Sequence, residues 1–192
     1  MRLTTLTIKK GFFEKTFSFA NNTNIIYSKK NSCGKTTLIR LLLYALGFNI
    51  PNTKKLKFNS LEVSLTLNHE VLGNINLIRE QQDQIILIHK NKRFTFSLPS
   101  EEKNVHQLIF NTENSDIINN LLGTFYIDQE KGWTLLNRGT VIGSIHFNIE
   151  ELIRGLGNNN SDKLLQKSDS ITREINQYKQ ILNISKYQKS IQ

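Results

Sequence analysis

The chain has 192 residues, 38% of them hydrophobic, which suffices for one sizeable core with little left over. It has no stretch of the roughly 18 apolar residues that a membrane span needs, no signal-peptide core, and one cysteine, Cys33, which excludes a disulfide framework and a Cys-rich zinc site. The net charge of +9 is uneven, because residues 1–60 carry eleven Lys and Arg against one acidic residue, and the rest carry fourteen against fifteen. We therefore expect a cytoplasmic protein without membrane contact, whose basic front end meets nucleotide phosphates or a nucleic-acid backbone; a solvated lysine surface is the alternative.

The first fifty residues predict three short strands, a loop and a helix. Weak alternation indicates strands at residues 2–8 and 17–19, and a compact apolar run at residues 24–27 indicates a buried third strand. After a polar loop, strong helix formers occupy residues 38–46, and Gly47 stands where a C-cap is expected.

Residues 61–98 have the texture of an antiparallel sheet. Apolar and polar residues alternate strictly from Leu61 to Asn68, and three further apolar runs follow, separated by turn residues. This pattern predicts a β-meander.

A helical region is predicted to follow the meander. Ser100 stands in the N-cap position, two acidic residues occupy the first turn, and the region extends to Leu122 with a break near Asn114. Two buried strands and a short helix are predicted next, at residues 125–127, 141–147 and 149–156.

The tail predicts a hinge and then a coiled-coil helix. Residues 155–160 are rich in Gly and Asn, and spaced apolar residues follow in a polar background. Their last four members have the 4-3-4 spacing of a coiled-coil seam. The alternative is a single amphipathic helix packed on the domain. The apolar residues are Leu164, Ile171, Ile175, Tyr178 and Leu182.

The most specific motif is a phosphate loop between the third predicted strand and the helix. The pattern Gly-x4-Gly-Lys-[Ser/Thr] is matched by Gly34, Lys35 and Thr36, with Lys29 in place of the first Gly. Because that Gly commonly supplies an unusual backbone angle, a loop that binds nucleotide without hydrolysing it is an open alternative.

The loop predicts ATP and Mg²⁺ as cofactors. Backbone N–H groups at a helix N-terminus face the β-phosphate, Lys35 neutralises the β- and γ-oxygens, and the Thr36 hydroxyl ligates Mg²⁺. The predicted nucleotide-binding residues are Asn31, Ser32, Cys33, Gly34, Lys35, Thr36 and Thr37.

Together these residues resemble the opening of the SMC/RecN-like ABC ATPases, a group of chromosome-organising and double-strand-break-repair ATPases with long coiled coils. Lys29, Lys30, Ser32 and Cys33 depart from the loop common in that group. The turn at residues 10–12 and the meander fit as well, so the resemblance covers most of the chain. The matching positions are residues 24–27, Asn31, residues 34–38, Arg40 and residues 43–47.

The resemblance implies an α/β fold, namely a P-loop ABC-ATPase half-head with an antiparallel β lobe over residues 1–157. Residues 158–192 are then the hinge and the start of a coiled-coil arm. It also implies that Gln129 is the Q-loop glutamine, which contacts Mg²⁺, senses the γ-phosphate and acts with Lys35 in catalysis. A rival interpretation makes residues 125–128 a Walker B strand, with Asp128 binding Mg²⁺ and Glu130 polarising water.

The resemblance further implies an incomplete head. In that group the signature motif, Walker B and switch His lie beyond the coiled coil, and no Ser-Gly-Gly signature occurs here. A second ATPase head, in a homodimer or as a C-terminal half-head, is the implied partner. The implied function is ATP hydrolysis that couples head engagement to double-stranded DNA, with a nuclease or other effector subunit. The implied context is bacterial genome maintenance, DNA repair or Lamassu-like anti-phage defence.

Two other functions are compatible with a phosphate loop. A non-hydrolysing nucleotide-binding scaffold subunit is the main alternative. A P-loop kinase or GTPase is disfavoured, because the chain offers no acceptor-binding lid and no Asn-Lys-x-Asp motif.

The remaining chemistry-bearing residues lead to two expectations. One or two basic residues suffice at a phosphate loop, so five further lysines are candidates for contacting a DNA backbone: Lys9, Lys10, Lys54, Lys55 and Lys57. The four histidines lack metal-ligand spacing and are expected to be ordinary surface or core residues: His69, His89, His106 and His146.

Overall fold

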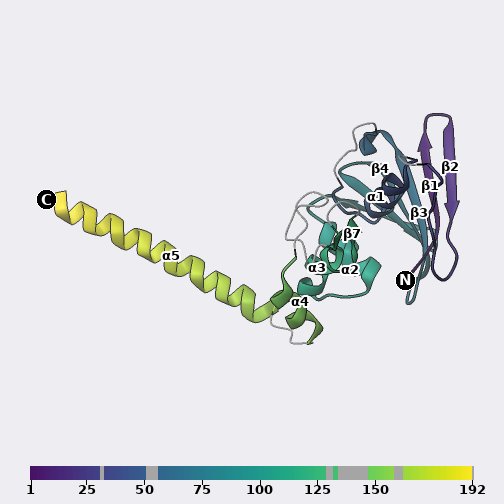
Figure 1. Cartoon of the computed structure of the whole chain (residues 1–192). Coiled ribbons are helices and arrows are strands. Elements are labelled where there is room, and N and C mark those ends of the chain that lie inside the picture. The colour runs from purple at the N-terminus through teal and green to yellow at the C-terminus, as the bar shows by residue number, and fades with distance from the viewer. Residues whose placement is uncertain (31–32, 51–55, 129–131, 134–146, 158–161, 192) are drawn as a thin grey trace.

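The computed structural model describes residues 1–30, 33–50, 56–128, 132–133, 147–157 and 162–191 (Figure 1). A β-sheet packs against helices, and one long helix extends away from this body to the C-terminus (Figure 1). The elements are, in chain order, β1 (Arg2–Lys10), β2 (Phe13–Ser18), α1 (Lys35–Ala45), a 3-10 turn (Phe58–Ser60), β3 (Glu62–His69), β4 (Gly73–Gln81), β5 (Gln84–His89), β6 (Lys92–Ser97), α2 (Glu102–Phe110), α3 (Ser115–Phe125), β7 (Ile127–Asp128), β8 (Gly132–Trp133), α4 (Ile149–Leu156) and α5 (Asp162–Ile191).

The large sheet has six strands in the order β2-β1-β3-β4-β5-β6, and every neighbouring pair is antiparallel. The predicted meander is confirmed as β3 to β6, and the strand predicted at residues 2–8 is confirmed as β1. In the register of the sheet, Leu65 of β3 lies between Leu6 of β1 and Leu77 of β4. All three side chains are fully buried, so this row forms part of the core.

The sheet has one buried face because its strands alternate. Val63, Leu65 and Leu67 of β3 are fully buried, whereas Ser64 and Thr66 between them are half-buried. Successive side chains of a strand point to opposite faces, so the apolar set turns toward α1 and α2 while the polar set lines the other face.

Helix α1 ends in a hydrogen-bonded turn that depends on Gly47. The Gly47 N–H donates to the Tyr44 carbonyl at 3.0 Å, and the Phe48 N–H donates to the Leu43 carbonyl at 3.2 Å. This pair of bonds is a Schellman motif, which needs a left-handed residue after the helix. Gly47 has φ 98°, so the predicted helix end is confirmed.

A buried arginine ties that helix end to the sheet. Arg79 of β4 is 2% exposed, and its Nη1 donates to the carbonyls of Tyr44 at 2.8 Å and Phe48 at 3.0 Å. Its Nη2 donates to the Gln82 carbonyl at 2.6 Å. The guanidinium also stacks on the Tyr44 ring, 3.8 Å from the centroid. A cation at a helix C-terminus is favourable, because the orphan carbonyls there carry partial negative charge.

The strand predicted at residues 24–27 is wrong. These residues form no strand, and Ile25 and Tyr27 are each 81% exposed. A strand needs a neighbour for its N–H and C=O groups, and no described strand pairs with this segment, since β2, the strand before it, has β1 as its neighbour at the edge of the sheet. The Asn24 side chain instead holds a local turn, accepting from the Ala20 N–H at 2.8 Å and donating to the Ala20 carbonyl at 3.1 Å.

The helical region after the meander breaks where expected, but its start is shifted. The N-cap of α2 is Glu101, not Ser100, because the Ser100 hydroxyl donates to the Ser97 carbonyl at 3.1 Å. The break falls at Asn111, which is left-handed with φ 50°. Asn114 then caps α3, accepting from the Asp116 and Ile117 N–H groups at 3.0 and 3.3 Å.

Helices α3 and α4 pack through buried polar contacts. Arg154 holds Asp116 with two bonds, of 2.6 Å from Nε and 3.1 Å from Nη2. Asn120 is fully buried and accepts from the Asn148 N–H at 2.6 Å. At Gly155 a Cβ would lie 2.9 Å from Ile117 Cγ1, so the two helices approach too closely there for a side chain. The helix predicted at residues 149–156 is confirmed with those bounds.

The strand predicted at residues 125–127 is largely wrong. Helix α3 continues through Phe125, which is 77% exposed. Tyr126 still donates its N–H to the Leu122 carbonyl at 3.0 Å, so helical bonding takes up the segment. Only Ile127 and Asp128 are extended, and they pair with Gly132–Trp133 in a two-residue hairpin outside the large sheet. The strand predicted at 141–147 falls almost wholly outside the described residues.

The tail is one helix of 30 residues, α5. Its described side chains are all exposed, and Figure 1 shows it leading away from the sheet and the shorter helices. This excludes the alternative of an amphipathic helix packed on the domain. Ile171, Ile175 and Tyr178 are 46%, 47% and 65% exposed and meet no partner helix within the described chain. None of the described helices combines the length and apolarity that crossing a membrane requires.

We predict that the chain loses stability as the pH falls from about 6.5 to about 4, because His106 is buried. Its Nε2 lies 3.1 Å from the Leu46 carbonyl, and the ring stacks on Phe48 at 4.3 Å. Burial lowers the pKa of His106 from 6.5 to about 4. Between these pH values His106 is protonated in the unfolded chain but not in the folded chain, so the free energy of unfolding rises with pH in this window.

The loss over this window is about 2–3 kcal/mol, since one pKa unit corresponds to about 1.4 kcal/mol. Urea unfolding at a series of pH values measures it. A His106→Leu variant removes the titrating group and should flatten the slope. An unchanged slope in that variant would assign the pH dependence to other groups.

Candidate functional site

The loop before α1 is held by local hydrogen bonds. The Ser28 Oγ accepts from the Lys30 N–H at 3.2 Å, and the exposed Cys33 donates its thiol to the Lys30 carbonyl at 3.0 Å. These contacts fold the loop on both sides of residues 31–32. The Cys33 side chain thus has a structural contact within the loop.

Helix α1 starts at the position predicted for the phosphate site. Its N-cap is Gly34, with φ 88°, and no side chain caps this end. The first helical bond runs from the Leu38 N–H to the Gly34 carbonyl at 2.9 Å. No acidic residue occupies the first turn. The N-terminal end of a helix attracts anions, and nothing acidic in this turn opposes that preference.

The predicted cofactor residues fall into two groups. Lys35, Thr36 and Thr37 are consecutive, half-buried residues of the first turn of α1, directly after Cys33 and Gly34. Their cationic and hydroxyl groups therefore share one helix end. Asn31, Ser32 and Gln129 lie outside the described residues, as does Glu130. Asp128 belongs to the β7–β8 hairpin.

The lysine that replaces the first Gly of the loop causes no backbone strain. Among the described residues, positive φ at a non-Gly position occurs only at Lys90, Asn91 and Asn111. Lys29 therefore has an ordinary backbone conformation, which any residue adopts without cost. In this structure Lys29 therefore occupies its position without the backbone angle that favours Gly.

Two of the four histidines are buried residues that hydrogen-bond to the backbone. Within the described chain, His, Cys, Asp and Glu form no group of three or more that could hold a metal ion. His69 and His106 are 3% exposed and hydrogen-bond to backbone groups. His146 lies outside the described residues.

The lysines proposed to contact DNA differ in the charge that they offer. Lys9 Nζ lies 3.8 Å from a carboxylate oxygen of both Glu14 and Glu62, which stand opposite it in the sheet. Its charge is therefore partly neutralised. Lys10 and Lys57 are exposed, whereas Lys54 and Lys55 lie outside the described residues.

Arg79 is the residue whose importance the sequence interpretation missed. The sequence interpretation gives Arg79 only as the end of a strand, Ile78-Arg79, that fits the antiparallel lobe of the resembled ATPases. A signal was available, because Arg79 has the same parity as Ile75 and Leu77 and so falls on the buried face of β4. A charged residue on a buried face needs partners, and the nearest unsatisfied groups are the carbonyls at the end of α1.

Two comparisons with known proteins bear on the identity of the chain. A profile of the AAA domain family AAA_23 matches residues 10–192. The Lamassu protein LmuB from a Bacillus sp. strain is 25% identical over 128 residues, which are 61% of this chain and 22% of LmuB. The chain thus matches only a small part of that relative's length. Since the family profile spans nearly the whole sequence, the chain belongs to the AAA domain family of SMC-like ATPases.

Proposed function

We propose that this chain is the ATP-binding half of an SMC-like ATPase head and that the N-terminus of α1 holds the phosphates. The observation that supports this most directly is the junction at Gly34, where an uncapped helix start without acidic residues carries Lys35 and Thr36 in its first turn. Lys35 neutralises the β- and γ-phosphate oxygens. Thr36 and, by family resemblance, Gln129 ligate Mg²⁺. The ordinary backbone of Lys29 supports a loop that is intact and able to act in hydrolysis.

The proposed head is incomplete without a second ATPase segment. The segment at residues 24–27 runs into the loop with two exposed apolar side chains, Ile25 and Tyr27. A neighbouring strand from a C-terminal half-head or a second chain would bury these side chains and pair the backbone. In this proposal residues 1–157 are the half-head. Residues 158–192 begin a coiled-coil arm, since the exposed stripe on α5 needs a second helix to cover it.

We further propose that ATP-driven engagement of two heads is coupled to double-stranded DNA. The excess of basic residues over positions 1–60 supports a polyanion partner beyond one nucleotide. The likeness to a protein named Lamassu LmuB supports anti-phage defence as the context and an assembly with further subunits, of which a nuclease is one candidate.

We predict that the purified chain of residues 1–192 binds ATP but hydrolyses it negligibly. In the resembled group the signature motif and the Walker B segment with its catalytic Glu lie beyond the coiled coil. Residues 1–192 contain no Ser-Gly-Gly signature motif, so both are expected to come from another segment. Calorimetry measures the binding, and phosphate release in single-turnover experiments measures the chemistry. Robust Mg²⁺-dependent turnover by a demonstrated monomer would favour Asp128 and Glu130 as a Walker B pair. In the assembled complex, binding without any turnover would favour the scaffold alternative.

A second prediction tests the DNA surface. Replacing Lys54, Lys55 and Lys57 with Glu should weaken duplex binding by the assembled complex and lower its salt dependence, because fewer counterions are released. A matched control reverses three exposed lysines outside residues 1–60, Lys90, Lys92 and Lys103, which changes the net charge equally and should change binding less. Unchanged affinity and salt slope in the triple variant would place the DNA surface elsewhere.

A further inference from the structure

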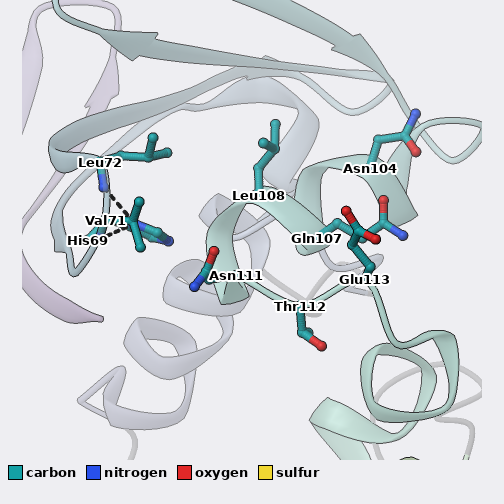
Figure 2. Close-up of a pocket in the computed structure, with 9 residues that line it drawn as sticks. All are labelled: His69, Val71, Leu72, Asn104, Gln107, Leu108, Asn111, Thr112 and Glu113. Atoms are coloured by element: carbon teal, nitrogen blue, oxygen red, sulfur yellow. Dashed lines mark hydrogen bonds between the residues drawn. The ribbon is translucent and has the colours of Figure 1, made fainter. Parts of the chain in front are cut away.

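A pocket of about 460 Å³ lies between the β3–β4 turn and helix α2, built from elements other than the phosphate loop. Figure 2 shows His69 at the end of β3, Val71 on the turn that follows, Leu108 on the facing side of α2, and Glu113 just beyond the helix end. Its volume falls within the range typical of ligand pockets, about 300–1,000 Å³. Neither the nucleotide nor the proposed coiled coil uses this pocket.

A buried histidine supplies a hydrogen-bond donor to the pocket. His69 is 3% exposed and lines the cavity. Its Nδ1 accepts from the Val71 N–H at 3.1 Å and the Leu72 N–H at 3.0 Å. Since Nδ1 acts as an acceptor, the neutral ring carries its proton on Nε2. No described group accepts from Nε2, and His69 lines the pocket, so this donor is available to an acceptor on a ligand.

One side of α2 presents a row of amides to the same pocket. Asn104 and Gln107 are spaced i and i+3 on one face of α2, Asn111 is the left-handed C-cap directly after the helix, and all three line the cavity. Their side-chain amides form no hydrogen bond within the described chain. Each amide offers both a donor and an acceptor, which is the pairing that peptide groups require.

The charge and the apolar surface of the pocket define the rest of the ligand. Glu113 is the only carboxylate among the described lining residues, which include no Lys or Arg. The pocket also lies at the C-terminal end of α2, the negative end of the helix dipole. Both features favour a cation and disfavour phosphate at this pocket. The local charge thus differs in sign from the net charge of the whole chain, which is +9. Val71 and Leu108 also line the pocket; they are 68% and 43% exposed and offer an apolar surface to the alkyl stem of a ligand.

We propose that this pocket binds a short segment of a partner polypeptide that carries an arginine or lysine. The basic side chain lies over Leu108 with its charge toward Glu113, and a backbone carbonyl of the segment accepts from His69 Nε2. The amide row on α2 pairs with the peptide groups. In Figure 2, Asn104, Gln107 and Glu113 gather at one end of the pocket and His69 with Asn111 at the other, as an extended segment requires. A free polyamine lacks the carbonyl acceptor, and a nucleotide carries the wrong charge.

The test is a titration of the ¹⁵N-labelled chain of residues 1–192 with acetyl-leucyl-arginine amide, followed by NMR. Peptides with glutamine or glutamate in place of arginine vary only the charge, and agmatine supplies the guanidinium without a peptide group. We expect saturable shifts at His69, Gln107 and Asn111. We expect affinity for the arginine peptide about threefold above the glutamine peptide and about tenfold above the glutamate peptide, in keeping with an exposed ion pair.

Two variants locate the charge preference. Glu113→Gln should abolish the preference for arginine over glutamine while leaving the glutamine peptide unaffected. Glu80→Gln, an exposed carboxylate on β4 outside the pocket, changes the net charge equally and should preserve the preference. Equal affinity for all three peptides, or shifts that map to other surfaces, overturns the proposal. Agmatine binding as tightly as the arginine peptide also overturns it, because the pocket would then take a free cation.

Discussion

Replacing Lys35 with Ala lowers the affinity for ATP roughly 10- to 100-fold, because a hydrogen bond to a charged group contributes about 1.5–3 kcal/mol. Lys35 is the first residue of α1 and the only basic residue in its first turn. Without it, the backbone N–H groups of the helix start remain, but the counter-charge to the β- and γ-phosphates is lost. Calorimetric titration with ATP and Mg²⁺ measures the change.

The matched control is Lys92→Ala. Lys92 is an exposed residue of β6, so its removal changes the net charge by the same amount without touching the helix start. ATP affinity should stay within about twofold of the parent chain, as expected for distant surface charges in physiological salt. If Lys35→Ala binds ATP as tightly as this control, the nucleotide site is not at α1.

Replacing Arg79 with Met lowers the free energy of unfolding by about 3–5 kcal/mol, one of the largest effects expected in the chain. Met approximates the length of the side chain but donates no hydrogen bond. The carbonyls of Tyr44, Phe48 and Gln82 each lose a donor. Because a domain is typically stable by only about 5–15 kcal/mol, this loss approaches the whole margin.

The consequence should reach the nucleotide site, since Arg79 anchors the C-terminal end of the same helix that starts at Lys35. Urea unfolding measures the stability, and amide hydrogen exchange along α1 shows whether that helix opens first. Arg93→Met is the matched control, because Arg93 is an exposed residue of β6. If Arg79→Met is no more destabilising than Arg93→Met, the bonds to the end of α1 contribute little.

The sequence by itself determined the elements whose signals are local. The strict alternation over residues 61–68 encodes which face of β3 is buried. Gly47 is the left-handed residue of the Schellman motif that ends α1, because that position requires a residue that tolerates positive φ. Asn114 caps α3 with its own side chain. The residues from Gly34 to Thr36 likewise predict a phosphate loop, since the motif is contiguous.

Only the tertiary structure decided features that depend on neighbours distant in sequence. The apolar run at residues 24–27 reads as a buried strand, yet it stays exposed because no described strand pairs with it. In the similar run at residues 125–127, Phe125 ends α3 and Tyr126 still donates to the Leu122 carbonyl, so only Ile127 lies in a strand. Arg79 becomes an anchor only when folding brings β4 beside the end of α1, 35 residues away along the chain. For these segments, pairing and hydrogen-bond partners depend on the assembled core, and the local pattern alone does not name them.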